Sequence, residues 1–220
     1  MDQNFRHFKI LAAAIPLTLL MMSFSKIHGK VVCFGDSITH GAQVDGHSWV
    51  WILSKEHKDV DFVNAGRNGR KTSDKAELLP VLKQNPDASC YIIFLGVNDL
   101  KDGTEAMVDS CLTNMKWMLA RIRETDPGAH IVILAPSDIN LKTMNQINRD
   151  KKYNEHTKAS LYSLENRYKA LASKEHIGFI SLLHVVSPAN YADGLHPTIQ
   201  GQTEIAGAVW KGLSHLSKKW

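Results

Sequence analysis

Four short segments of the sequence combine glycine with polar side chains, and each follows an apolar run that is typical of a buried strand. They are GDS at 35–37, NAGRNGR at 64–70, GVND at 96–99 and YADGLHP at 191–197. Serine, histidine and aspartate are the side chains of nucleophilic acyl transfer, so the first and last segments suggest a serine hydrolase. Taken alone, GDS would also fit a phosphate-binding loop or an ordinary strand-to-helix turn.

Nucleophilic attack by Ser37 needs a general base and a group that orients this base. A serine hydroxyl is a poor nucleophile until a base removes its proton, and His196 is the candidate base at neutral pH. Asp193, three residues earlier, can accept a hydrogen bond from the far ring nitrogen of His196, which sets the tautomer and stabilises the imidazolium. We therefore expect a catalytic triad of Ser37, His196 and Asp193. A phosphate loop would leave Asp193 and His196 without a role.

The elements that must position these residues alternate along the chain. Apolar runs at 30–35, 60–66, 90–96, 130–135 and 177–183 predict five strands. Stretches with helical spacing predict helices at 48–58, 74–84, 104–125, 151–174 and 198–215. Strands separated by helices form βαβ units, so we expect an α/β fold with a five-stranded, mostly parallel sheet covered on both faces. Ligands bind beyond the carboxyl ends of such strands, where the four polar segments should converge.

The segment 74–84 gives two different signals. Asp74 and Glu77 fit a capping box at the start of a helix. Pro80, in the middle of the segment, predicts that the helix kinks or ends there.

The four polar segments, in this order, resemble the sequence blocks of the SGNH (GDSL) family of serine esterases and lipases. The matching residues are Ser37, Gly66, Asn98 and His196, surrounded by GDSIT, GxND and DxxHP. The resemblance covers the chain after its first 25 residues and implies a three-layer, flavodoxin-like fold and hydrolysis of an acyl ester. It also assigns the oxyanion hole to the backbone N–H groups of Ser37 and Gly66 and to the side-chain amide of Asn98.

Three residues within these segments, Arg67, Asn68 and Tyr191, are candidates for substrate binding. Arg67 belongs to a cationic run with Arg70 and Lys71, which we expect to be exposed beside the site. This run could hold a polar or anionic substrate, or it could cap the next helix and remain solvated. Tyr191, two residues before Asp193, could shape the entrance.

We expect the enzyme to remove short acyl groups such as acetyl. By analogy, its substrates should be esters of glycans or of small molecules. The nearest alternative is a lysophospholipase or thioesterase that acts on longer acyl chains, and acyl transfer to another sugar would use the same residues. A non-catalytic binding module is the alternative from a different class. The mechanism requires no cofactor, and no His or Cys spacing typical of a metal site is present.

The first 25 residues have the pattern of a secretory signal peptide. Arg6 and Lys9 precede a 15-residue, largely apolar run, and Ser23 and Ser25 suit a cleavage site after Ser25. This run is shorter than the roughly 20 residues of a membrane-spanning helix, although an uncleaved anchor is the alternative. We therefore expect a signal peptide at 1–25, a hydrolase domain at 26–220, and a secreted or periplasmic enzyme without stable membrane association.

Charge and cysteine content limit the other functions. Removal of residues 1–25 takes away Arg6, Lys9 and Asp2, so the formal net charge of +4 falls to +3. This weak, scattered charge argues against a nucleic-acid partner. Cys33 and Cys90 lie in apolar runs and should be small core residues, with a disulfide between them as the lesser alternative.

Overall fold

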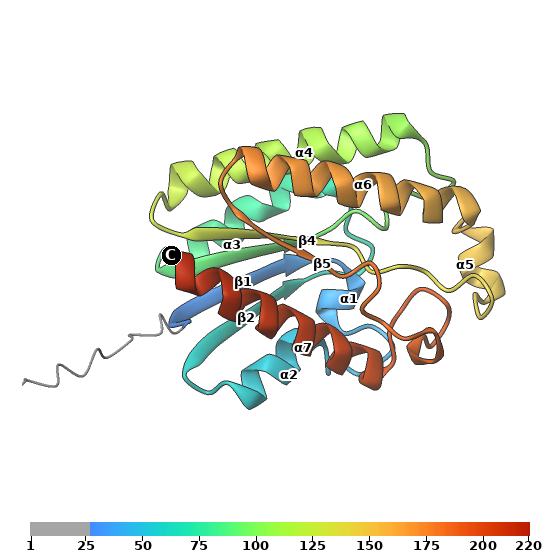
Figure 1. Cartoon of the computed structure of the whole chain (residues 1–220), viewed down its shortest axis with the longest axis horizontal. Coiled ribbons are helices and arrows are strands. Elements are labelled where there is room, and N and C mark those ends of the chain that lie inside the picture. The colour runs from blue at the N-terminus through green and yellow to red at the C-terminus, as the bar shows by residue number, and fades with distance from the viewer. Residues whose placement is uncertain (1–26) are drawn as a thin grey trace, which may run out of the picture.

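Five parallel strands form one sheet in the order β2-β1-β3-β4-β5 (Figure 1). The computed structural model describes residues 27–220, and the five strands lie within this range. The strands are β1 (Gly29–Gly35), β2 (Val60–Gly66), β3 (Ala88–Phe94), β4 (His130–Ala135) and β5 (Gly178–Ser181). The residues of β3 and β4 are nearly all buried, as expected for strands that are covered on both faces.

Helices cover both faces of this sheet (Figure 1). On one face lie α2 (Trp49–Glu56) and α7 (Ile199–Leu216), which pack against each other. On the other lie α3 (Leu78–Gln84), α4 (Glu105–Thr125) and α6 (Glu155–Lys174). Two apolar cores lie between the sheet and the two helical layers, one on each face of the sheet. The predicted three-layer α/β fold is confirmed, and the strand order reverses beside β1, which lies between β2 and β3.

The structure differs from the expected elements mainly in three segments, and the helix expected at 151–174 begins only at Glu155. Two short helices, α1 (Ser37–His40) and α5 (Gln146–Asp150), occupy segments for which no helix was expected. The segment 74–84 is divided into a 3₁₀ helix, η1 (Thr72–Glu77), and α3. Pro80 lies in the first turn of α3, where its missing N–H costs no intrahelical hydrogen bond.

The capping box expected from Asp74 and Glu77 is wrong. The Asp74 carboxylate does accept a backbone hydrogen bond, but from the N–H of Lys71 at 3.0 Å. The Glu77 carboxylate instead pairs with the guanidinium groups of Arg67 and Arg70. Both acids therefore hold the segment that follows β2, and neither caps a helix that begins at Asp74.

The three cysteines of the chain, Cys33, Cys90 and Cys111, are buried and free. Cys33 on β1 and Cys90 on β3 belong to the same apolar core, where burial raises the pKa of the Cys90 thiol to about 12. The prediction that Cys33 and Cys90 are small core residues is confirmed, and the structure contains no bond between them.

The membrane and signal predictions concern different parts of the chain. Within residues 27–220, no helix combines the length and apolar character needed to cross a membrane. The predicted signal peptide at 1–25 lies outside the described residues.

The junction of β1 and α1 is packed so closely that its sequence has little freedom. A Cβ on Gly35 would lie 2.1 Å from the Thr39 hydroxyl oxygen, so only glycine fits where the chain turns into α1. Asp36 is the N-cap of α1, and its carboxylate accepts a hydrogen bond from the Ile38 N–H at 3.0 Å. Burial raises the pKa of Asp36 to about 7, against the opposing effect of the Ile38 hydrogen bond.

Asp36 should make the stability of the protein depend on pH. Because its pKa is 3.8 in the unfolded chain and about 7 in the fold, the folded state binds a proton that the unfolded state does not bind between these values. The free energy of unfolding should therefore fall as pH rises from 4 to 7, by up to about 4 kcal/mol for this group at 1.36 kcal/mol per unit. Urea unfolding of wild type and Asp36→Asn at several pH values measures it. Parallel curves for the two proteins would contradict the prediction.

Candidate active site

Ser37, His196 and Asp193 form one hydrogen-bonded chain at the carboxyl edge of the sheet. The Ser37 Oγ lies 3.0 Å from the Nε2 of His196. The Nδ1 of the same ring lies 2.8 Å from the Asp193 Oδ2. All three side chains are at least partly shielded from solvent, and the Ser37 residue is 6% exposed. Residues that are 159 positions apart in the sequence therefore meet as the sheet topology predicted.

Within the loop that carries His196, the Asp193 side chain is hydrogen-bonded to the backbone. The Asp193 Oδ1 accepts hydrogen bonds from the N–H groups of Leu195 and His196 at 3.0 and 2.7 Å. Burial acts to raise the pKa of Asp193, but the hydrogen bonds from His196 and Leu195 outweigh it and hold the pKa well below its ordinary value. Asp193 is therefore ionised at neutral pH and fixes the imidazole through Nδ1.

Asn98 follows β3 and lies beside the Ser37 turn, which is the junction of β1 and α1 at residues 35–37. Its residue is 5% exposed, and its amide nitrogen lies 3.2 Å from the backbone carbonyl oxygen of Arg70. The same nitrogen has a longer contact of 3.5 Å with the Asp36 Oδ2. The Asn98 Oδ1 accepts a hydrogen bond from the Tyr153 hydroxyl at 2.7 Å. The amide is therefore held from both ends.

Gly66 lies at the end of β2, close to the backbone of α1. A Cβ at this position would be 2.3 Å from the His40 nitrogen, so the close approach that requires glycine is to the protein's own chain. The Gly66 N–H donates a hydrogen bond to the Asn64 Oδ1 at 2.9 Å. This N–H, which the resemblance assigns to the oxyanion hole, thus has an acceptor within the chain.

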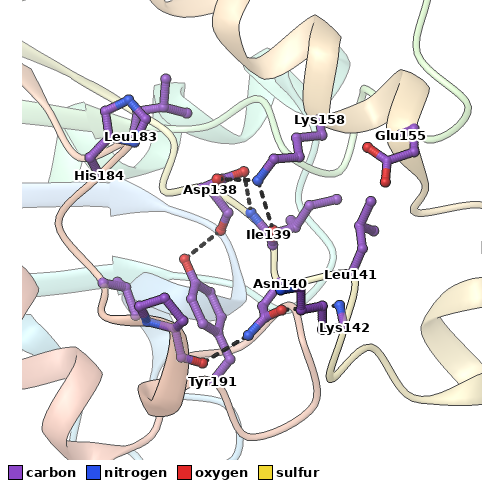
Figure 2. A pocket seen from close by; sticks show the side chains of 12 residues that line it. Asp138, Ile139, Asn140, Leu141, Lys142, Glu155, Lys158, Leu183, His184 and Tyr191 are labelled. Carbon is purple, nitrogen blue, oxygen red and sulfur yellow. Dashed lines mark hydrogen bonds and ion pairs between the residues drawn. The ribbon is translucent and has the colours of Figure 1, made fainter.

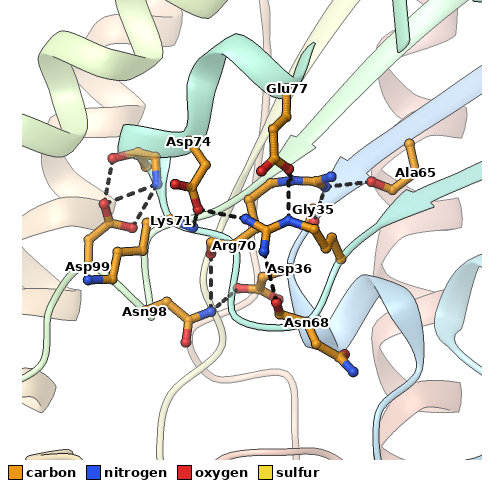
Figure 3. Close-up of polar contacts among 12 residues, drawn as sticks. Gly35, Asp36, Ala65, Asn68, Arg70, Lys71, Asp74, Glu77, Asn98 and Asp99 are labelled. Atoms are coloured by element: carbon orange, nitrogen blue, oxygen red, sulfur yellow. Dashed lines mark hydrogen bonds and ion pairs between the residues drawn. The ribbon is translucent and has the colours of Figure 1, made fainter. Parts of the chain in front are cut away.

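Arg70 is buried, contrary to the expectation that it is exposed (Figure 3). One guanidinium nitrogen donates to the carbonyl oxygens of Gly35 at 2.5 Å and Ala65 at 2.6 Å. The group also pairs with Glu77 at 3.0 Å and lies 4.1 Å from the centre of the Phe34 ring. Burial is tolerated because carbonyl and carboxylate oxygens surround the charge. Arg70 therefore joins strand ends and is not a solvated surface group.

The other candidate substrate residues have different environments. Arg67 is exposed but pairs with both Asp74 and Glu77 at 2.8 Å. Asn68 is exposed in the same turn (Figure 3). The two ion pairs balance the charge of Arg67. The Asn68 side chain lies near the solvent.

Tyr191 lines a pocket of about 410 Å³ that does not include the Ser37–His196–Asp193 chain (Figure 2). Its hydroxyl donates to the Asp138 carbonyl oxygen at 2.7 Å, and the residue is 8% exposed. Tyr191 thus supports the loop before Asp193 and faces this neighbouring pocket.

Two positions in and just after α5 contact the site and were missed by the sequence reasoning. The Asn148 side chain donates to the Asp193 carbonyl oxygen at 3.2 Å, and Tyr153 reaches Asn98 as described above. Both residues are buried. An asparagine and a tyrosine among polar neighbours gave no sequence signal for this role. Among residues 27–220, no three His, Cys, Asp or Glu side chains are grouped to hold a metal ion.

Comparison with known proteins places the chain in a family. Residues 33–203 match the GDSL-like lipase/acylhydrolase family, and this range contains all the residues of the hydrogen-bonded site. The esterase TesA of Pseudomonas aeruginosa is 26% identical over 210 residues, which cover 91% of this chain and 95% of TesA. An uncharacterised protein of Mycoplasma pneumoniae is 29% identical over 138 residues, which are 54% of this chain but only 16% of that protein.

Solved structures share the fold at lower sequence identity. The aryl esterase of M. smegmatis aligns with a TM-score of 0.72 and 21% identity over 86% of this chain and 99% of its own. Est24, a carbohydrate acetylesterase from Sinorhizobium meliloti, aligns with a TM-score of 0.71 and 18% identity over 85% of this chain and 99% of its own. The extent of the family match is decisive: the chain belongs to the GDSL-like lipase/acylhydrolase family of ester hydrolases.

Proposed function

We propose that the chain hydrolyses short-chain acyl esters through an acyl-enzyme on Ser37. The observation that carries the proposal is the continuous hydrogen-bonded chain from the Ser37 Oγ through both ring nitrogens of His196 to Asp193, with contacts of 3.0 and 2.8 Å. The low pKa of Asp193 keeps a carboxylate opposite Nδ1, so Nδ1 carries the proton and Nε2 is free to accept one.

The reaction then follows from the positions of these groups. The Ser37 Oγ attacks the ester carbonyl carbon while its proton passes to the Nε2 of His196. Collapse of the tetrahedral intermediate breaks the bond to the alcohol oxygen, which takes the proton from Nε2. Water then attacks the acyl-enzyme and gives one proton to Nε2. Collapse of the second tetrahedral intermediate releases the carboxylic acid, and the proton passes from Nε2 back to the Ser37 Oγ. Asp193 stabilises the imidazolium in both halves of the reaction.

We propose that the Ser37 N–H and the Asn98 amide are the main donors to the oxyanion. Ser37 is the first residue of α1, where a backbone N–H has no partner within the helix. The Asn98 nitrogen lies beside the Ser37 turn, as shown by its contacts with Arg70 and Asp36. The Gly66 N–H would contribute only if it shared or exchanged its hydrogen bond with Asn64.

We further propose acetyl esters of glycans as the substrate class. The resemblance to Est24, a carbohydrate acetylesterase, supports this choice at the level of the fold. The charge of Arg67 is balanced by Asp74 and Glu77, which favours a neutral acyl ester over an anionic one. The N-terminal sequence pattern supports an exported enzyme, whose substrates would lie outside the cytoplasm.

Replacement of Ser37 by alanine should remove turnover and leave the fold intact. Without the nucleophile, kcat should fall by at least about a thousandfold, the scale of loss known for other serine hydrolases. Hydrolysis of p-nitrophenyl acetate measures the loss, and circular dichroism monitors folding. Ser110→Ala is the matched control, because this hydroxyl donates to the Ala106 carbonyl oxygen within α4. Wild-type turnover by Ser37→Ala would show that another group is the nucleophile.

Acyl length should separate the proposed substrate from the alternative. The kcat/KM for p-nitrophenyl esters should be highest for acetate and decrease through butyrate to octanoate. A steep rise with chain length would instead support a lysophospholipase or thioesterase. Acetate release from acetylated glycans, with Ser37→Ala as the blank, tests the carbohydrate part of the proposal separately.

Export should produce a mature chain that begins at Lys26. Mass spectrometry of the intact protein, recovered from the periplasm or medium of a bacterium expressing the full sequence, measures this directly. An intact Met1 on all exported or membrane-bound protein would favour an uncleaved anchor.

A further inference from the structure

Tyr153 occupies a rigid position between α5 and α6. It is 2% exposed, and its backbone N–H donates to the Asn148 carbonyl oxygen at 3.1 Å. Lys152, directly before it, has a φ of 66°, a backbone conformation that residues other than glycine rarely adopt. The Lys152 carbonyl oxygen accepts hydrogen bonds from the Asp102 N–H and the Thr157 hydroxyl, which hold this conformation. The backbone at Tyr153 is therefore fixed, and its side chain is packed in the apolar core.

The contacts around Asn98 determine which way its amide is turned. The carbonyl oxygen of Arg70 can only accept a hydrogen bond, so the group 3.2 Å away from it must be the NH₂ of Asn98. The Asn98 oxygen then faces Tyr153, and the tyrosine hydroxyl must be the donor in the 2.7 Å hydrogen bond. One amide hydrogen points to the Arg70 carbonyl oxygen, and the other makes the longer contact of 3.5 Å with the Asp36 Oδ2.

This arrangement suits an amide that must donate to a developing negative charge. The hydrogen bond from Tyr153 withdraws charge from the Asn98 oxygen and thereby strengthens its N–H groups as donors. It also opposes rotation of the amide, which would present an oxygen to the oxyanion. Burial raises the pKa of Tyr153 above its ordinary value, so the hydroxyl keeps its proton at neutral pH.

We infer that Tyr153 is a positioning residue for ester hydrolysis, which acts through Asn98 by holding the amide nitrogen toward the oxyanion. The inference rests on the proposed oxyanion role of Asn98 and extends it to a residue 55 positions away. Tyr153 itself does not touch the substrate. Its effect should therefore be on the transition state, where the oxyanion forms, and not on ground-state binding.

Tyr153→Phe tests this inference, because it removes the hydroxyl and keeps the ring. Loss of one oxyanion donor lowers kcat by about a hundredfold or more, and a donor that is present but unfixed should lose part of this, about tenfold. KM for p-nitrophenyl acetate should stay within twofold of wild type. Tyr91→Phe is the matched control: this buried hydroxyl donates to the Asn85 carbonyl oxygen at 2.8 Å, near the opposite end of β3. It should leave kcat unchanged.

A double-mutant cycle separates positioning from general destabilisation. In an Asn98→Ala background, Tyr153→Phe should cause no further loss of kcat, since the amide that it orients is absent. Active sites are counted by titration with a phosphonate ester run to completion, so that unfolded protein is not read as a lower kcat. The same loss from Tyr153→Phe in both backgrounds, or no loss in wild type, would overturn the inference. A wild-type kcat for Asn98→Ala would refute the role of Asn98 and the inference with it, while leaving Ser37 as nucleophile.

Discussion

A single buried guanidinium holds together the strand ends on which the site is built. The main-chain carbonyls of Gly35 and Ala65, at or next to the last residues of β1 and β2, both accept hydrogen bonds from the Arg70 side chain, and the Gly35 carbonyl also accepts one from the Arg67 N–H at 3.1 Å. A buried polar group without a partner would be costly, so one cation with several donors stabilises this junction. The carbonyl of Arg70 in turn accepts from Asn98 after β3. The ends of three adjacent strands are thereby fixed relative to one another.

The C-terminal part of the site is fixed by a separate set of contacts. The carbonyl oxygen of Asp193 accepts hydrogen bonds from the Asn145 N–H and the Asn148 amide, both from the segment around α5. Gly194, with a φ of 82°, passes so close to Met144 that a Cβ would lie 2.4 Å from its Cα. The α5 segment thus supports Asp193 on one side and, through Tyr153, Asn98 on the other. Asp193 and Asn98, which belong to different parts of the site, are thus positioned by the same segment.

The sequence was sufficient to predict the sheet, its helical layers and the meeting of Ser37, Asp193 and His196. These predictions rest on hydrophobic periodicity and on strand direction, which are local or topological properties. The environment of Arg70 could not be predicted in this way. A cationic run in a sequence predicts a solvated surface. The fold shows instead that two carbonyl oxygens and one carboxylate converge on the Arg70 guanidinium. The contact of Tyr153 with Asn98 could not be predicted for the same reason, because the two residues are 55 positions apart in the sequence.

The environment of Gly66 changes the balance within the proposed oxyanion hole. Its N–H is bonded to Asn64, whose amide nitrogen is itself bonded to the Thr39 carbonyl oxygen and the Ser48 hydroxyl. These contacts tie β2 to α1 and to the start of α2, so releasing Asn64 would disturb packing as well as one hydrogen bond. If this network persists when substrate binds, the oxyanion depends on a backbone N–H of Ser37 and a side-chain amide of Asn98. A backbone donor is fixed by the helix turn, whereas an amide can rotate. The orientation of the Asn98 amide must then be held by another group, and the Tyr153 hydroxyl is placed to hold it.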